Sequence, residues 1–429
     1  EDLSLRLDIG KLLMKRQLVI LKVEIRSPEL TVIRDKEGRI NLESLGKTSA
    51  LKRAAVETFQ HAEGFDFGPA EALALPEDEI IPSFLIQAIF VQNGSIHFID
   101  RSLEPELSLE FSRLDLKIHR FSLSAPFGFF VEGALFSDQK NSQLEGKARI
   151  LGTGGQFQLS DVHIATNLSQ LSLEKLRGSF PLLNKFPFPS AVNGKIQCTI
   201  KNLELGPQGL RDISAEGELQ GGSLSFKEIS PGISFMISQI DLKFKNLSLS
   251  SPFEWTARAA LFSDRPNIFM KGQGRFDPQI GSIQLKNTNL SADLALISLP
   301  QLKSSMSILK NLASLESLAG KFDATFEVSA ASKGSAFVSG QGELKDGMVK
   351  LKECLLPFES IYSRFEISGP QIHVPEFFLK IGRGAFHAQG KVEDYLGAQD
   401  FTGELDLKDI DLGQTIDQTT MPVKIQGIL

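Results

Sequence analysis

Six histidines are the first residues to consider for chemistry, because an imidazole can act as a general base or as a metal ligand. They are scattered along the chain, and most stand on the polar side of an alternating stretch. Neither an HExxH motif nor two histidines at helical spacing occur. The pattern indicates solvated histidines on strands rather than a metal site or a catalytic base. The six residues are His61, His97, His119, His163, His373 and His387.

Glycine clusters are the second candidate, because the backbone N–H groups of a glycine-rich loop can hold a phosphate group. Such clusters lie at residues 152–155, 272–274 and 382–384. None matches a Walker or dinucleotide-binding pattern, and none leads into a helix, which this kind of phosphate binding requires. We interpret all three clusters as hairpin turns.

Nucleophiles, paired carboxylates and thiols are the remaining candidates. No GxSxG motif is present, and Asp138 and Asp264 follow serine in pairs typical of turns rather than of a catalytic carboxylate pair. Cys198 and Cys354 belong to no CxxC pattern and fit small buried apolar positions. We therefore expect no enzymatic activity, no cofactor and no metal site.

An internal repeat organises the chain instead. Residues 112–138 and 238–264 align without a gap at an offset of 126 and share 14 of 27 residues. Such self-similarity is typical of repeat proteins. We expect a mainly β fold, namely an elongated, curved antiparallel β-sheet groove built from repeats of about 126 residues, with a few short helices.

Glycine turns that feed alternating strands mark where each repeat begins, in the sequences QNGSIHF, QGGSLSF and KDGMVKL. We expect the third copy to be truncated. The expected divisions are an N-terminal segment of strands, helix and linker over 1–85, followed by repeats over 86–216, 217–341 and 342–429.

The N-terminal segment has its own pattern. Apolar residues alternate over 3–9 as in a half-buried strand, and Pro28 interrupts a later pair of strands. Gly38 supplies the left-handed turn before a return strand. Residues 47–63 place apolar side chains at helical spacing, and 64–83 is rich in glycine, proline and acidic residues, as in a loop.

One segment between repeats also departs from the strand pattern. Within residues 293–318, Leu302, Met306, Leu309 and Leu312 follow one another at spacings of three and four. That spacing predicts a helix that packs against the sheet.

Apolar residues alternate with polar ones along each repeated block, and the alternation slips by one residue after Ile118 and again after Phe244. The same slip in both copies predicts a β-bulge, which bends the strand. The apolar face so defined is our candidate binding surface. Its residues are Leu114, Leu116, Ile118, Ile240, Leu242, Phe244, Phe365 and Ile367.

Composition narrows the class of ligand. The chain has 32 Phe against 2 Tyr and 1 Trp, whereas surfaces that recognise sugars or proteins favour the polar tips of Tyr and Trp. A formal net charge of -6 argues against nucleic acid as a partner. No apolar run is long enough to cross a membrane, and no signal peptide is present. Because the chain starts at Glu1, we expect it to be a fragment of a longer protein.

The stretch KLLMKRQLVILKVEIRSPELTVIRDKEGRINLESL, residues 11–45, resembles the AsmA-like family of Gram-negative bacteria. The strands around residues 144–147 and 389–392 extend the resemblance, which covers most of the chain. This family is related to TamB and to eukaryotic chorein-type bridge proteins. The resemblance implies a periplasmic lipid-binding groove that is anchored in the inner membrane by a helix preceding Glu1. It also implies phospholipid movement toward the outer membrane, upkeep of that membrane and a possible partner there.

Physical reasoning agrees with that implication, since an apolar sheet face must be covered by something, and phospholipid acyl chains would cover it without specific polar contacts. Two alternatives remain open. A lipid-free scaffold for outer-membrane protein assembly would hide the face between two sheets. A β-helical polysaccharide lyase or hydrolase would need clustered aromatic and acidic residues, which the sequence lacks.

Overall fold

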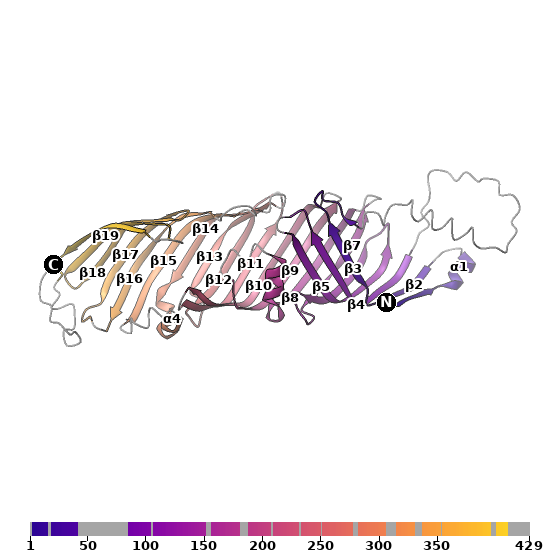
Figure 1. The fold of residues 1–429 in the computed structure, drawn as a ribbon, viewed down its shortest axis with the longest axis horizontal. Coiled ribbons are helices and arrows are strands. Elements are labelled where there is room, and N and C mark those ends of the chain that lie inside the picture. The colour runs from indigo at the N-terminus through magenta and orange to yellow at the C-terminus, as the bar shows by residue number, and fades with distance from the viewer. Residues whose placement is uncertain are drawn as a thin grey trace. The chain divides into compact units, whose positions relative to one another are not determined.

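Twenty strands dominate the described residues of the computed structural model, and all of them belong to one sheet. Among these residues no pairing joins the first strand, β1 (Asp2–Leu7), to the last, β20 (Asp400–Lys408), so the sheet is open. Figure 1 shows the strands from residue 233 to residue 393, labelled β11 to β19, one after another in the order of the chain. The mainly β class predicted from the sequence is confirmed. The structure describes residues 2–15, 19–41, 85–103, 106–151, 156–180, 188–206, 209–230, 233–249, 251–277, 282–305, 315–330, 337–352, 354–395 and 400–410.

The chain divides into two compact units, and each is described separately here. Unit 1 comprises residues 1–166, 170–184 and 199–214, and unit 2 comprises 167–169, 185–198 and 215–429. The early strands are β1 (Asp2–Leu7), β2 (Val19–Arg26), β3 (Glu29–Arg34), β4 (Leu85–Asp100), β5 (Leu107–Ser122), β6 (Phe127–Leu135), β7 (Ser142–Leu151) and β8 (Gln156–Asn167). Strands β9 (Ala191–Gly206) and β10 (Gly209–Ser230) contribute to both units. The later strands are β11 (Ile233–Leu247), β12 (Phe253–Leu261), β13 (Ile268–Asp277), β14 (Ser282–Asp293), β15 (Leu315–Ala330), β16 (Phe337–Leu351), β17 (Phe358–Ser368), β18 (Gln371–Ile381), β19 (Gly384–Glu393) and β20 (Asp400–Lys408).

Unit 1 begins with two parallel pairings, which the sequence did not predict. Strands β2 and β3 both run parallel to the long strand β4, one along each half of it, and β1 pairs antiparallel with β2. Pro28 separates β2 from β3, as predicted, because proline has no N–H to give to a ladder. The N–H of Ser95 donates to the Pro28 carbonyl at 2.8 Å, so β4 continues past the break. From β4 to β8 each strand is antiparallel to the next.

Several N-terminal predictions need correction. The strand predicted over 3–9 ends at Leu7 and is exposed rather than half-buried, with Leu3 72% accessible. A helix that the alternation did not reveal, α1 (Ile9–Lys15), follows it. The turn at Gly38 is confirmed by a φ of 82°, but within the described residues the return strand is reduced to one bridge between Arg34 and Ile40. The helix predicted over 47–63 and the loop over 64–83 lie outside the described residues.

In unit 2, every strand from β10 to β20 pairs antiparallel with its successor. The short helices α3 (Leu173–Ser179) and α4 (Leu299–Ser305) occupy equivalent places 126 residues apart, each after a 3₁₀ turn, η2 (Leu168–Gln170) or η4 (Leu294–Leu296). The helix expected within 293–318 is thus present as α4, which contains Leu302. The remaining residues of its predicted apolar stripe, from Met306 onward, lie outside the described residues.

Positive φ angles recur with the same offset. Most of them mark bulges within strands, whereas Phe136 and Phe262 lie just past the ends of β6 and β12. Arg120 (56°) and Asn246 (57°) stand where the sequence predicts the phase slip, and in β11 the pairing register shifts beside Asn246. The sequence did not predict the other repeated positions, because their polar neighbours show no break in alternation. These pairs are Arg113 and Gln239, Phe136 and Phe262, and Asp161 and Asn287.

Two of the three glycine clusters can be checked. Residues 382–384 form the predicted turn, with a φ of 57° at Gly382. Residues 272–274 do not: they lie inside β13, and the hairpin prediction is wrong. A Cβ on Gly274 would stand 2.2 Å from Cζ of Phe253, so the glycine is present because an aromatic ring from β12 packs over it. Residues 152–155 lie outside the described residues.

Candidate functional site

The apolar face of unit 2 is continuous across many strands. Cross-strand register places one residue from each of eight neighbouring strands opposite the next, and none of these residues is charged. This central row runs through Leu219, Leu242, Ala257, Met270, Leu290, Ala324, Gly342 and Phe365.

Rows on either side of the central row keep the same character, because residues two apart in a strand share a face. One flanking row comprises Ala259, Ile268, Ala292, Phe322, Leu344, Ser363, Phe377, Ala388 and Leu405. The other comprises Gly217, Phe244, Trp255 and Gly272 and, after a bulge in β14, Thr288, Phe326, Gly340, Ile367 and Ile372. The three rows together are called the apolar face of unit 2.

Unit 1 carries a shorter version of the same arrangement. Its central row comprises Val91, Leu116, Val131, Leu144 and Ile164, from strands β4 to β8. Beside it, Ile118 pairs with Ile89 and Phe129, while Leu114 lies opposite Gly94. Each unit therefore presents an uncharged apolar face on its own strands.

The structure places seven of the eight predicted residues on these faces, and the eighth, Ile240, lies two residues from Leu242 on the same strand and so faces the same side. Leu114 is buried and the other seven are half-buried. The three from the first repeat lie together on β5, and those of the second repeat lie on β11, where Ile240 is opposite Gly222. The central row connects Leu242 to Phe365 through five intervening residues.

Some of these residues have a structural task that would exist without any ligand. The Phe365 ring covers Gly342, whose added Cβ would stand 2.3 Å from Cζ of the ring. Phe244 covers Gly217 in the same way at 2.5 Å. Aromatic rings that lie over strand glycines fill the space left by the missing side chains. Part of the phenylalanine bias in the composition follows from this packing.

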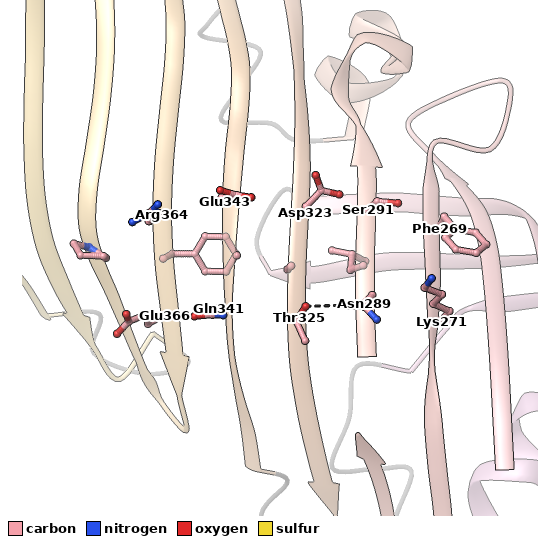
Figure 2. Close-up of a pocket in the computed structure, with 15 residues that line it drawn as sticks. Phe269, Lys271, Asn289, Ser291, Asp323, Thr325, Gln341, Glu343, Arg364 and Glu366 are labelled. Atoms are coloured by element: carbon pink, nitrogen blue, oxygen red, sulfur yellow. Dashed lines mark hydrogen bonds between the residues drawn. The ribbon is translucent and has the colours of Figure 1, made fainter. Parts of the chain in front are cut away.

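A hollow in unit 2 is lined mostly by the opposite, polar face and also by Leu290, Ala324, Gly342 and Phe365 of the central row. Its volume is about 860 Å³, and Phe365 is the one predicted residue among those that line it. Figure 2 shows its labelled side chains in two rows across strands β13 to β17. One row comprises Lys271, Asn289, Thr325, Gln341 and Glu366, and the other comprises Phe269, Ser291, Asp323, Glu343 and Arg364.

Sequence reasoning did not select these polar residues, although strict alternation already put them on the face away from the apolar rows. Within the hollow Thr325 Oγ1 donates to Asn289 Oδ1 at 2.9 Å. Two cationic and three acidic side chains balance to a small net charge, so the hollow offers hydrogen bonds rather than a strong field. This chemistry suits a polar ligand and not an acyl chain.

Charged residues on the polar face also hold the repeated bulges. The N–H of Gly221 donates to Asp241 Oδ1 at 2.9 Å, and Arg258 Nε donates to Oδ2 at 2.8 Å. Those two donors hold the pKa of Asp241 below its usual range. At the equivalent position in unit 1, burial alone would raise the pKa of Asp115, but hydrogen bonds from Lys140 and from the N–H of Asn93 lower it.

In the described part of the chain, no group of three or more His, Cys, Asp or Glu residues could hold a metal ion. Cys198 and Cys354 are half-buried, and burial raises the pKa of Cys198. None of the described helices is long and apolar enough to span a bilayer.

Comparison with known proteins returned no match among protein-family models, curated proteins or solved structures. The site must therefore be interpreted from its own geometry.

Proposed function

We propose that this chain binds phospholipid acyl chains on its apolar faces and serves as a periplasmic segment of a lipid conduit between the inner and outer membranes. One observation carries the proposal: an uncharged apolar row crosses eight consecutive strands of unit 2. Strands stand about 4.8 Å apart, so such a row offers an acyl chain a surface longer than the chain itself.

Partial exposure supports the same conclusion. Most side chains of the three rows are half-buried rather than buried, and no second sheet lies over them in the described residues. Burying apolar area stabilises by about 25 cal/mol per Å², so acyl chains gain by lying there while their head groups stay in water. An anchor in the inner membrane and a partner at the outer membrane, which the AsmA-like resemblance implies, belong to this proposal.

A lipid-free scaffold is the competing function, and the rings of Phe244 and Phe365 over glycines favour it. In that case the apolar faces would serve packing and assembly only. A β-helical lyase or hydrolase has little support from the described residues, because no Tyr, Trp or His stands beside Asp323, Glu343 and Glu366 in the lining of the polar hollow.

Native mass spectrometry with lipid extraction distinguishes lipid conduit from scaffold. The purified chain should carry several phospholipids, and Leu116→Asp with Leu242→Asp should remove them by placing two charges on the central rows. The matched control is His119→Asp with Thr256→Asp, at exposed positions of the polar face on β5 and β12. The control should keep its lipids. A folded wild-type chain without lipid, or equal lipid content in both variants, would overturn the proposal.

A further inference from the structure

A polar pair interrupts the apolar face where β12, β13 and β14 meet. Trp255 Nε1 and Thr288 Oγ1 are buried side-chain atoms that have no hydrogen-bond partner within the described residues. Thr288 is 0% accessible and Trp255 9%. Buried polar groups are almost always paired in folded proteins, so an unpaired one asks for a specific explanation.

The two atoms converge over one glycine. A Cβ on Gly272 would lie 3.0 Å from Thr288 Oγ1 and 3.1 Å from Trp255 Nε1. Gly272 pairs directly with Trp255 across β12 and β13, and the bulge at Asn287, with a φ of 50°, turns Thr288 toward the same side. The indole N–H and the hydroxyl group therefore face a common point on the apolar face.

The first repeat shows that the fold does not need this polarity. Offset by 126 residues, Phe129 replaces Trp255 and Val162 replaces Thr288, while Gly146 keeps the glycine. The bulge is also kept, at Asp161 with a φ of 52°. Val162 is 1% accessible and packs against Gly146, so apolar side chains fill the same site without leaving a polar atom unpaired.

The chemistry of the pair limits what it can bind. Trp Nε1 is a donor only, so the ligand atom must be a hydrogen-bond acceptor, and a threonine hydroxyl can donate to that same atom. No charged residue lies on the surrounding apolar rows, which disfavours a phosphate or a carboxylate. An uncharged carbonyl oxygen with two lone pairs is the acceptor that fits. In a phospholipid that atom is the ester carbonyl at the head of each acyl chain.

We propose that Trp255 and Thr288 form a polar subsite that binds the ester carbonyl of an acyl lipid and so fixes the lipid's position along the conduit. This inference rests on the proposed function. Both atoms are buried without ligand, so the indole must turn about its side-chain torsions to admit the ester. Trp255 is the single tryptophan of the sequence, and its fluorescence therefore reports on this subsite alone.

The test compares two phospholipids that differ at one bond. Vesicles of dipalmitoyl phosphatidylcholine carry ester carbonyls, and vesicles of its dihexadecyl ether analogue do not. The wild-type chain should take up the ester lipid about tenfold more tightly, and only the ester should shift the Trp255 emission. Thr288→Val, which copies the first repeat and preserves shape, should lower the preference several-fold. Trp255→Phe with Thr288→Val should abolish it.

Stability provides a second measurement, which distinguishes a pair that binds a ligand from a pair that only stabilises the fold. Replacing both polar groups by apolar ones of similar shape should leave the urea midpoint of the lipid-free chain unchanged or higher. Equal uptake of ester and ether lipids by the wild-type chain would overturn the subsite but leave the conduit standing. A preference kept by both variants would also overturn it. Failure to take up either lipid would overturn the conduit and the subsite together.

Discussion

The Phe365 ring stacks on the ring of Phe322, with centroids 5.3 Å apart and planes inclined by 9°. The two residues come from β17 and β15, and the ring of Phe365 reaches across Gly342 of the strand between them. The stacked rings and the covered glycine form one packed cluster, so this part of the apolar face contributes to stability whether or not a lipid is bound.

Removing the ring from this cluster, or replacing its glycine, should destabilise the chain. Phe365→Ala deletes a half-buried ring and its stack, and we expect a loss of about 2 kcal/mol in the free energy of unfolding. Gly342→Ala should cost a similar amount, because its Cβ would stand 2.3 Å from Cζ of Phe365. Urea denaturation of the two single variants and of the double variant measures both effects.

The double variant gives the sharper result. Once the ring is absent, a Cβ at position 342 still stands 2.8 Å from the Cβ of Ala324, so alanine there should cost less than before but not nothing, and the double variant should lose less than the sum of the two single losses. Phe269→Ala is the matched control, since that ring lies on the polar face, is 45% accessible and is not packed over a glycine of the described residues, so its removal should change the stability little. Simple additivity of the two losses would show that the ring does not act through Gly342.

Two asparagines should be equally important in the two repeats. Asn141 accepts from the N–H of Leu135 and donates to its carbonyl, and Asn267 does the same for Leu261. Each is 7% accessible. Replacement by alanine leaves a strand end with an unpaired buried N–H and C=O, which costs about 1–3 kcal/mol. Thermal unfolding of the single variants should show losses of the same size, whereas Asn193→Ala at an exposed site should show little loss.

How much of the fold could be predicted from the sequence depends on how far apart in the chain the interacting residues lie. Alternation and the repeat predicted the β class, the two apolar faces and the phase slip at Asn246, because these features depend on local periodicity. The parallel pairing of β2 and β3 with β4 depends on contacts between residues about 65 positions apart, such as Thr31 and His97, which periodicity does not encode. The glycines of β13 were misread as turns for the same reason, since the ring that explains Gly274 belongs to another strand.

The site was partly predictable. Half-buried residues of the apolar face followed from alternation, but the unpaired atoms of Trp255 and Thr288 did not. A signal was nevertheless present, because comparison of the repeats shows Trp in place of Phe129 and Thr in place of Val162. Two polar substitutions on a face that is apolar in the sister copy are visible in the alignment. Their convergence over Gly272 required coordinates.

Each of the helices α3 and α4 donates one side-chain hydrogen bond to an aspartate, and the two donors should be interchangeable between the repeats. Lys175 donates to Asp138 at 2.8 Å in the first repeat, and Gln301 donates to Asp264 at 2.8 Å in the second. Lys175→Gln therefore copies the hydrogen bond of the second repeat into the first repeat. Because the Asp138 side chain is 84% accessible, the ion pair is screened by water, and the urea midpoint should not change measurably. A clear loss of stability would mean that the charge, and not the hydrogen bond, fixes α3.

Lowering the pH should destabilise the bulge of the second repeat, because the carboxylate of Asp241 becomes protonated. The Gly221 N–H and Arg258 lower the pKa of this carboxyl in the folded chain, so its ionised form contributes stability above the pKa of the unfolded chain, about 4. That contribution is lost as the pH falls through the depressed folded value. Asp241→Asn keeps an acceptor for Gly221 but cannot titrate, so its stability should fall less steeply than that of the wild type below about pH 4. Urea midpoints measured from pH 3 to pH 7 test this. Parallel curves for the two proteins would show that Asp241 holds the bulge by its shape and not by its charge.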